Sequence, residues 1–370
     1  MKKYFLTLSM LFLMMTALVA VAGAEETKVG GMTIDEIKSA LGMSVYFQGG
    51  YIYNFSDPDS NENGLRVFDH EANSFTLDLA QLVFTRDAPV GGVGYRLKLS
   101  AGETAKWIHA AGLGTTDDAF DLTEAYIDYV APLGKGLKFR FGKFVTMHGA
   151  EVIEARDNMN YSRGLLFNFA IPFTHTGLMV GYPISDKVSA NFYVVNGWDN
   201  FDDEGSSKTL GLSVSVTPSE QFSAVVNLMN GRELDLQTGI SSNRILLDAV
   251  ATVKPAKNLT LVLNGDYAVQ SNSAPDGDDA KWYGIAGYAK YDFSDLFSAT
   301  VRAEYFKDSD GARTLTAQTV KEITVTPEFR VAKNLIVRPE YRHDWSDKES
   351  FDSGSKKSQD TLALGIMYTW

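Results

Sequence analysis

The sequence predicts an all-β fold, a transmembrane antiparallel up-and-down β-barrel of about 16 strands. Two observations carry this prediction. From residue 43 onward, apolar and polar residues alternate with a period of two, which is typical of strands that have one buried face. The segments between these strands are alternately short and long. Outer-membrane barrels have this arrangement, with short periplasmic turns and long extracellular loops.

The alternation is clear in the segment 95–101. Tyr95 and Leu97 share one face, whereas Arg96 and Lys98 share the other. The same pattern recurs in three further segments: 209–216, 297–305 and 335–342. Within the last of these, Ile336 is the one apolar residue on the polar face. A soluble sandwich or a small soluble barrel would also alternate, but neither has a reason to alternate its connections.

The connections fall into two classes by length and by their content of turn residues. The short ones, rich in Pro, Gly, Asp or Asn, are 87–92, 132–136, 185–187, 218–221, 254–258, 292–296 and 331–334. The long polar ones are 56–73, 102–119, 145–164, 199–207, 231–243, 270–280, 307–316 and 346–358. Counting between them predicts about sixteen strands, with about 14 or about 18 as alternatives, and places both termini on the periplasmic side.

Three regions are expected along the chain. Residues 1–24 have the basic start, apolar run and small-residue cleavage site of a signal peptide. Residues 25–42 form a periplasmic segment, in which Thr33 begins a capping box of a short helix. Residues 43–370 form the barrel. Its last strand, 361–370, is expected to close against Tyr46 and Gln48, with Gly365 leaving room on the lumen face.

Composition excludes several classes of protein. The chain has no cysteine, which excludes disulfide scaffolds, zinc ribbons and thiol enzymes. Its net charge is −12, and cleavage of the signal with Lys2 and Lys3 would make it −14. An acidic chain is a poor binder of nucleic acid. No apolar run of ~18 residues follows the signal, so no transmembrane helix is expected.

The polar faces of the strands are expected to line a wide, water-filled lumen, because unpaired buried charges are too costly. The pore-lining candidates on the strands are Arg96, Lys98, Glu124, Asp128, Lys138, Arg140, Arg302, Glu304, Arg338, Glu340 and Arg342. Their charges would create a transverse field that orients solutes. Alternatively, they would form salt bridges between strands that stiffen the wall.

The long segment 145–164 differs from the other loops because apolar residues separate its charges. It adds the constriction candidates Glu151, Glu154, Arg156, Asp157 and Arg163. Apolar anchors favour a loop that folds into the barrel and narrows it, since long ordered loops are often functional. A packed outer lid is the alternative.

No catalytic or metal site is predicted. Several outer loops are acidic, which would attract cations or simply keep the loops solvated. The stretch 59–70 begins like a calcium loop but ends in His70 in place of the closing glutamate. No histidine pair has metal spacing, and no serine lies in a Gly-x-Ser-x-Gly motif. We interpret His175 as structural, although a lipid enzyme would use such a histidine. No cofactor is expected.

The stretch 142–200 resembles the OmpL-like β-barrel porin-2 family. The likeness is carried by Gly142-Lys143-Phe144, Gly149-Ala150-Glu151, Asn160-Tyr161-Ser162-Arg163, Ile171-Pro172-Phe173-Thr174-His175-Thr176-Gly177 and Val195-Asn196-Gly197-Trp198-Asp199. Where the family pattern leads us to expect a proline, this chain has Met147 and His148. The resemblance implies a diffusion channel in the bacterial outer membrane.

We therefore predict a passive porin for small hydrophilic solutes and ions, and not an enzyme. Outer-membrane lipid would surround the barrel, and the C-terminal strand resembles the signal read by outer-membrane assembly machinery. A homotrimer is implied by the resemblance. The alternative is a barrel that is not a channel, either an adhesin or a lipid-modifying enzyme.

Overall fold

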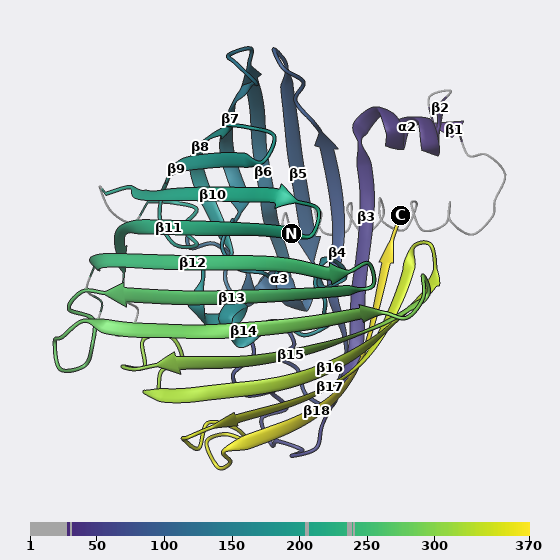
Figure 1. Cartoon of the computed structure of the whole chain (residues 1–370). Helices are drawn as coiled ribbons and strands as arrows, with labels where there is room; N and C mark the ends of the chain where they lie inside the picture. Colours follow the sequence, from purple (N-terminus) through teal and green to yellow (C-terminus); the bar gives the residue numbers. More distant parts are fainter. Residues whose placement is uncertain (1–27, 30–31, 204–206, 235–238, 240) are drawn as a thin grey trace, which may run out of the picture.

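A computed structural model describes residues 28–29, 32–203, 207–234, 239 and 241–370. Sixteen antiparallel strands close into one barrel, with each strand paired to its neighbours in sequence, which confirms the predicted fold and strand number (Figure 1). The strands are β3 (Met43–Asn54), β4 (Ser74–Arg86), β5 (Val93–Ala101), β6 (Phe120–Ala131), β7 (Leu137–Val145), β8 (Thr174–Pro183), β9 (Val188–Val195), β10 (Thr209–Ser219), β11 (Phe222–Leu234), β12 (Ser241–Ala256), β13 (Leu259–Gln270), β14 (Ala280–Asp292), β15 (Phe297–Asp308), β16 (Gln318–Ala332), β17 (Leu335–Ser346) and β18 (Ser358–Thr369).

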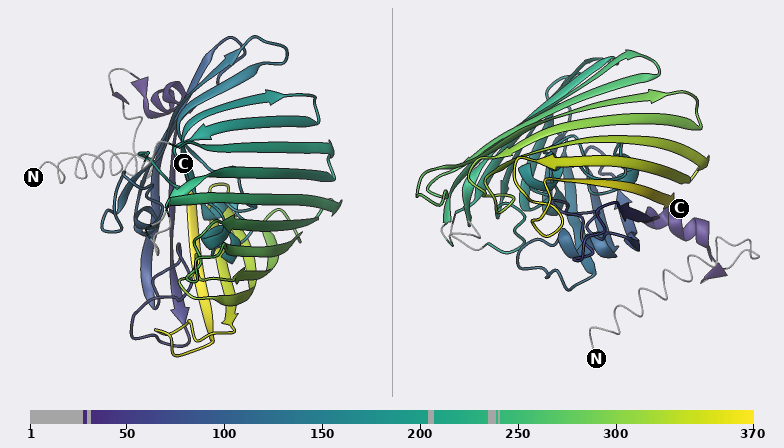
Figure 2. Two further views of the ribbon diagram at one scale, coloured as in Figure 1. Left: turned by 90° about the vertical axis from the view of Figure 1, so that its left-hand side faces the viewer. Right: turned by 90° about the horizontal axis from the view of Figure 1, so that it is seen from below.

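The first and last barrel strands close the barrel, as the sequence predicted. Thr369 pairs with Tyr46, and Gly365 lies opposite Gly50. Backbone hydrogen bonds of 2.8 and 2.9 Å also join Val45 and Trp370. The purple β3 and the yellow β18 lie side by side in both views of Figure 2. Closure leaves no free sheet edge, as a barrel in lipid requires.

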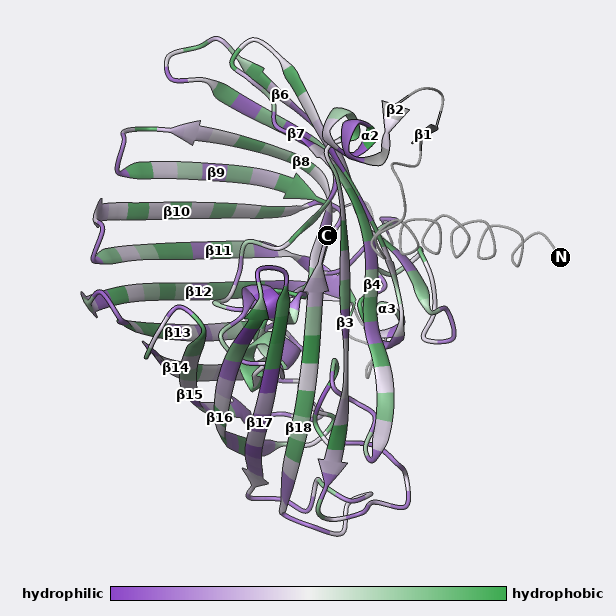
Figure 3. Cartoon of the chain, turned by 90° about the vertical axis from the view of Figure 1, so that its right-hand side faces the viewer, coloured by the Kyte–Doolittle hydropathy of each residue, from purple (hydrophilic) through white to green (hydrophobic). Residues whose placement is uncertain are grey.

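The faces of the strands follow the predicted alternation. Along β12, Ile245 and Leu247 are exposed on the outside, whereas Arg244 and Asp248 are buried on the inside. The same banding of apolar and polar residues is visible along β9 to β13 in Figure 3. The outer wall is therefore apolar, and the inner wall carries the charges.

Before the barrel lies the predicted short helix, α2 (Ile34–Leu41), preceded by β1 (Lys28–Val29) and β2 (Met32–Thr33). The Thr33 hydroxyl accepts from the Glu36 amide and the Glu36 carboxylate accepts from the Thr33 amide, so the capping box is present. The predicted signal peptide lies outside the described residues. None of the described helices has the length and apolar character needed to span a bilayer.

Two connections contain helical turns that the sequence did not predict. One is α3 (Glu103–Trp107), in the loop between β5 and β6. The other connection is the inner loop, which we define as residues 146–173 between β7 and β8. It contains a 3-10 turn (Ala155–Asp157) and a π-helical turn (Leu166–Ala170). The predicted end of this loop at residue 164 was wrong, because an apolar run such as 165–171 suits a buried helical turn as well as a strand.

An apolar core lies inside the barrel, where the inner loop meets the wall. Leu166 and Phe167 of the loop pack in one cluster with Trp282, Phe306 and other wall residues. The lumen is consequently narrower than the strand count alone suggested. Burying each such large apolar side chain contributes on the order of 1.5–3 kcal/mol, so the loop is held by packing as well as by polar contacts.

Two paired glycines make room for the inner loop. A Cβ atom on Gly365 would lie 2.3 Å from the Tyr161 ring, and one on Gly50 would lie 2.6 Å from its hydroxyl. The Tyr161 side chain therefore occupies the space that the sequence predicted on the lumen face of the last strand.

We predict that Gly365→Val displaces Tyr161 and loosens the inner loop, because the new side chain overlaps the tyrosine ring. Hydrogen exchange of the amides of residues 146–173 should rise by tenfold or more, on the order of 1.4 kcal/mol or more of lost docking, while the barrel keeps its resistance to unfolding in cold detergent. The control is Gly287→Val, since nothing lies within 4 Å of a Cβ atom there. Equal loop protection in both variants would contradict the assignment.

Candidate functional site

Three arginines of the inner wall hold the carbonyl groups of the inner loop. Arg338 donates to the carbonyls of Ala155, Asn158 and Asn160 at 2.6, 2.8 and 2.9 Å. Arg302 donates to the Ser162 carbonyl at 2.6 Å. Arg342 likewise donates to the Arg163 carbonyl. All three arginine side chains are at most 1% exposed.

Carboxylates of the same wall accept from the amides of the loop. Glu340 accepts from the Tyr161 and Ser162 amides at 2.7 and 3.0 Å. Asp248 accepts from the Gly149 amide at 2.7 Å. Glu304 accepts from the Leu165 amide. The charged wall from β12 to β17 thus pairs with both kinds of backbone group along the loop.

The opposite wall binds the loop through side chains. Lys98 contacts Glu154 of the loop at 2.7 Å. The Tyr161 hydroxyl donates to Asp78 at 2.5 Å. Gln48 pairs with Leu79, and Gly49 with Leu77, so Asp78 is an extra bulge residue in β4. A bulge re-aims a side chain, and here the carboxylate points at Tyr161.

Two aspartates that the sequence placed in exposed acidic loops bond other parts of the chain, and of these Asp69 is buried and Asp199 is half-buried. Asp199 accepts from the Phe173 and Thr174 amides at 2.6 and 2.8 Å, where the inner loop ends. Burial raises the pKa of Asp199 to about 6. Asp69 pairs with Arg66 at 2.6 Å, within the stretch that resembled the start of a calcium loop. The sequence showed charge but could not show that these loops fold inward.

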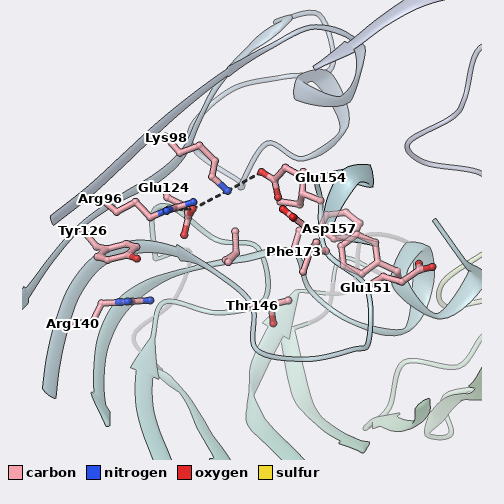
Figure 4. A pocket seen from close by; sticks show the side chains of 14 residues that line it. Arg96, Lys98, Glu124, Tyr126, Arg140, Thr146, Glu151, Glu154, Asp157 and Phe173 are labelled. Atoms are coloured by element: carbon pink, nitrogen blue, oxygen red, sulfur yellow. Dashed lines mark hydrogen bonds and ion pairs between the residues drawn. The ribbon is translucent and has the colours of Figure 1, made fainter. Parts of the chain in front are cut away.

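One gap remains between the inner loop and the wall formed by β5, β6 and β7. It is a cavity of about 320 Å³. Figure 4 shows Arg96, Lys98, Glu124, Tyr126 and Arg140 on its wall side and Glu154 and Asp157 of the loop on the other side. Glu151 also lines the gap, but its carboxylate pairs with Arg302. The loop therefore folds into the barrel and narrows it, as the favoured interpretation of segment 145–164 expected.

On the wall side of the gap, Arg96, Lys138 and Arg140 are partly exposed, whereas Lys98 and the carboxylates of Glu124 and Asp128 are buried. Arg96 is 28% exposed but pairs at 2.6 Å with Glu124, which is 4% exposed. Arg140 pairs with Asp128 at 2.8 Å, and Lys138 contacts the same carboxylate at 3.0 Å. On the loop side, Asp157 is 54% exposed. The solvent in the gap thus meets basic groups on one side and an acidic group on the other.

Fifteen of the sixteen candidates from the sequence fall into two groups, and Arg156 instead lines a separate cavity beside Thr369. Around the gap or at its edge lie Arg96, Lys98, Glu124, Asp128, Lys138, Arg140, Glu151, Glu154 and Asp157. Buried against or within the inner loop lie Arg163, Arg302, Glu304, Arg338, Glu340 and Arg342. The open, water-facing position expected for the five wall residues of this second group was wrong, because the inner loop covers them. Arg163, expected in a constricting loop, is buried within that loop. Sequence reasoning missed Tyr126, Thr146 and Phe173, which also line the gap.

The buried histidines have structural partners. His175 contacts the Gly197 carbonyl and the Thr146 hydroxyl, at 3.3 and 3.1 Å. His148 contacts the same hydroxyl at 3.1 Å. Burial, together with the nearby His175, lowers the pKa of His148 to about 3. Across the described part of the chain, no group of three or more metal-ligating side chains comes together.

Comparisons with known proteins give one family and a common fold. The model of the family described as "Putative beta-barrel porin-2, OmpL-like" matches residues 40–370. The outer membrane channel DcaP of Acinetobacter baumannii has a TM-score of 0.61 at 10% identity, covering 89% of this chain and 96% of its own. The anion-selective porin from Comamonas acidovorans has a TM-score of 0.64 at 12% identity, with 89% and 98% covered.

A third similar structure is the trimer form of OmpT, an outer membrane protein of Vibrio cholerae. Its TM-score is 0.58 at 11% identity, with 89% of this chain and 98% of that chain covered. No match was found among curated proteins.

We predict that Arg338→Gln loosens the inner loop, because the Asn158 and Asn160 carbonyls lose the arginine donor, and an unpaired buried carbonyl costs about 1–3 kcal/mol. The Ala155 carbonyl keeps the Asn158 amide at 3.1 Å. Single-channel recordings in planar bilayers should show larger and noisier conductance. Arg330→Gln is the matched control, since Arg330 also pairs with Glu328 but bonds the Asp295 carbonyl and not the loop. Identical traces from both variants would contradict the role of Arg338 in holding the inner loop against the wall.

Acidification is predicted to open the inner loop near His148. The folded pKa of about 3 lies below the ordinary value of about 6.5, so the docked state is favoured fully above pH 6.5 and loses stability as pH falls toward 3. At pH 4 the loss is about 3 kcal/mol. Openings should be more frequent at pH 4 than at pH 7, and less pH-dependent in His148→Gln. His70→Gln, in an outer loop, should behave as wild type.

Proposed function

Since the chain belongs to the OmpL-like β-barrel porin-2 family, we propose that small hydrophilic solutes cross it through the gap between β5–β7 and the inner loop. The protein is a channel of the bacterial outer membrane for passive diffusion. The short-turn end of the barrel faces the periplasm, and the long loops face outward. The observation that supports this route is the cavity of about 320 Å³ beside a lumen otherwise occupied by the loop.

We propose further that the gap prefers anions modestly. Arg96, Lys138 and Arg140 are partly exposed, while the carboxylates of Glu124 and Asp128 are buried beneath them. Asp157 opposes these cations across the gap and limits the preference. The basic side chains on one side of the gap and Asp157 on the other also orient polar solutes. The similar porin from Comamonas acidovorans is named as anion-selective, which agrees with this reading.

The remaining partners are proposals as well. Exposed apolar side chains on the outer wall, such as Phe75, Leu77 and Phe141, suit contact with outer-membrane lipid. A homotrimer is proposed because the similar OmpT is described as a trimer. The last strand is proposed to carry the signal for the assembly machinery. No catalytic role is proposed, since His175 is bonded to the Gly197 carbonyl and Thr146.

The ion preference is tested with Arg96→Gln and Arg140→Gln, measured as the reversal potential in a salt gradient. Each should shift selectivity toward cations, because a partly exposed cation leaves the gap. In these variants Glu124 still pairs with Lys98 at 2.9 Å, and Asp128 still pairs with Lys138. Neither variant therefore leaves a buried carboxylate without an ion-pair partner.

Two further variants complete this test. Asp157→Asn should shift the reversal potential in the opposite direction. Lys187→Gln, in an exposed turn at the periplasmic end, should leave it unchanged. If the reversal potential is the same in wild type and in the Arg96, Arg140 and Asp157 variants, the gap is not the ion path.

A further inference from the structure

A second cavity lies at the periplasmic end of the barrel, on the far side of the 3-10 turn from the gap. Its volume is about 440 Å³, and it is bounded by α2, the end of β18 and the turn between β16 and β17. We call it the periplasmic recess. The turn separates the two cavities, because Asp157 lines the gap whereas Arg156 lines the recess.

Three cations from three separate elements line the recess. Lys38 comes from α2, Lys333 from the turn before β17, and Arg156 from the inner loop. Among the described residues, neither lysine has an ion-pair partner, and the Lys38 ammonium lies 4.3 Å from the centre of the Trp370 ring. Arg156 donates to the Thr369 hydroxyl at 2.7 Å and pairs with Asp157 at 3.2 Å. The two lysines are therefore the cations of the recess that have no described ion-pair partner.

Apart from Asn334 and Thr369, the rest of the recess is lined by apolar side chains. Ile336 is the one apolar residue on the polar face of its segment, an exception already visible in the sequence. It lines the recess together with Met367, which is buried, and the Trp370 ring. A floor of this kind suits the hydrocarbon part of a ligand, because pockets for small molecules combine an apolar lining with a few placed polar groups.

The position of the recess distinguishes it from the conduction path. Above it, Tyr161 fills the space over Gly50 and Gly365, so the inner loop covers this sector of the lumen. A ligand would reach the recess from the periplasmic side. Binding of a ligand in the recess does not require solutes to cross the gap. The proposed binding site can therefore be tested independently of the proposed ion path.

We propose that the periplasmic recess binds a small aromatic carboxylate. The carboxylate lies among Lys38, Lys333 and Arg156, and the ring packs on Ile336, Met367 and Trp370. An aliphatic anion as short as acetate gains the charge contacts but not the apolar floor. The phosphate of an anionic lipid offers the same charge, but the inward-facing lining of β17 and β18 favours a soluble ligand.

The experiment is a calorimetric titration of the purified full-length protein in neutral detergent with benzoate and, separately, acetate. Wild type should bind benzoate saturably at one site, with acetate at least about fivefold weaker. The double variant Lys38→Gln/Lys333→Gln should weaken benzoate binding about fivefold, since two of the three cations are removed and exposed ion pairs are individually weak. The control Lys187→Gln/Lys257→Gln removes two exposed lysines from other turns at the same end.

Several outcomes would overturn the proposal. They are the absence of saturable benzoate binding, equal affinity for acetate and benzoate, and equal affinity in the two double variants. Retention of the compact, cold-detergent form on unheated gels shows that each variant is folded. A repeat in nanodiscs separates the two sources of anion. Loss of benzoate binding when phosphatidylglycerol replaces phosphatidylcholine would assign the recess to a lipid phosphate instead.

Discussion

The peptide groups of the inner loop lie inside the barrel, and the rest of the structure depends on how they are paired. A buried amide or carbonyl without a partner costs about 1–3 kcal/mol. The wall supplies these partners: Arg338 serves three carbonyls and Glu340 two amides. Many charges of the inner wall are therefore docking groups for the loop. This explains why they are buried in a barrel whose width would otherwise leave them in water.

Docking of the loop determines where the channel is open. Hydrogen bonds hold the loop on β12 to β17, while Tyr161 and Glu154 fix it to β4 and β5 on the other side. The apolar turn Leu166–Ala170 fills the sector beside β13 and β14. What remains is the gap along β5, β6 and β7. The gap presents positive charge to solvent, because its arginine side chains are partly exposed while their carboxylate partners are buried.

The 3-10 turn Ala155–Asp157 has two different faces toward solvent. One carries Asp157 into the gap, where it opposes the cations of the wall. The other carries Arg156 toward Lys38 and Trp370 at the periplasmic end. Arg338 of the wall fixes this turn by donating to the Ala155 carbonyl. A change in loop docking would therefore alter the gap and the recess together.

Local patterns were sufficient to predict much of this protein. The period of two assigned the lipid and lumen faces, the alternation of turns and loops yielded the strand number, and the Thr33 capping box predicted α2. Gly365 marked the space into which Tyr161 fits. Each of these features depends on neighbours in sequence or on a regular repeat, so a single sequence carries it.

Tertiary structure alone decided which charges are solvated. The run 165–171 suited a strand as well as a buried turn, and only contact with Trp282 and Phe306 resolves it. Asp199 looked like an exposed loop acid until the end of the inner loop was seen to bond it. Arg302 and Ser162 are 140 residues apart in sequence. Contacts at such separations leave no periodic trace in the sequence, because they depend on where the closed barrel brings distant segments together.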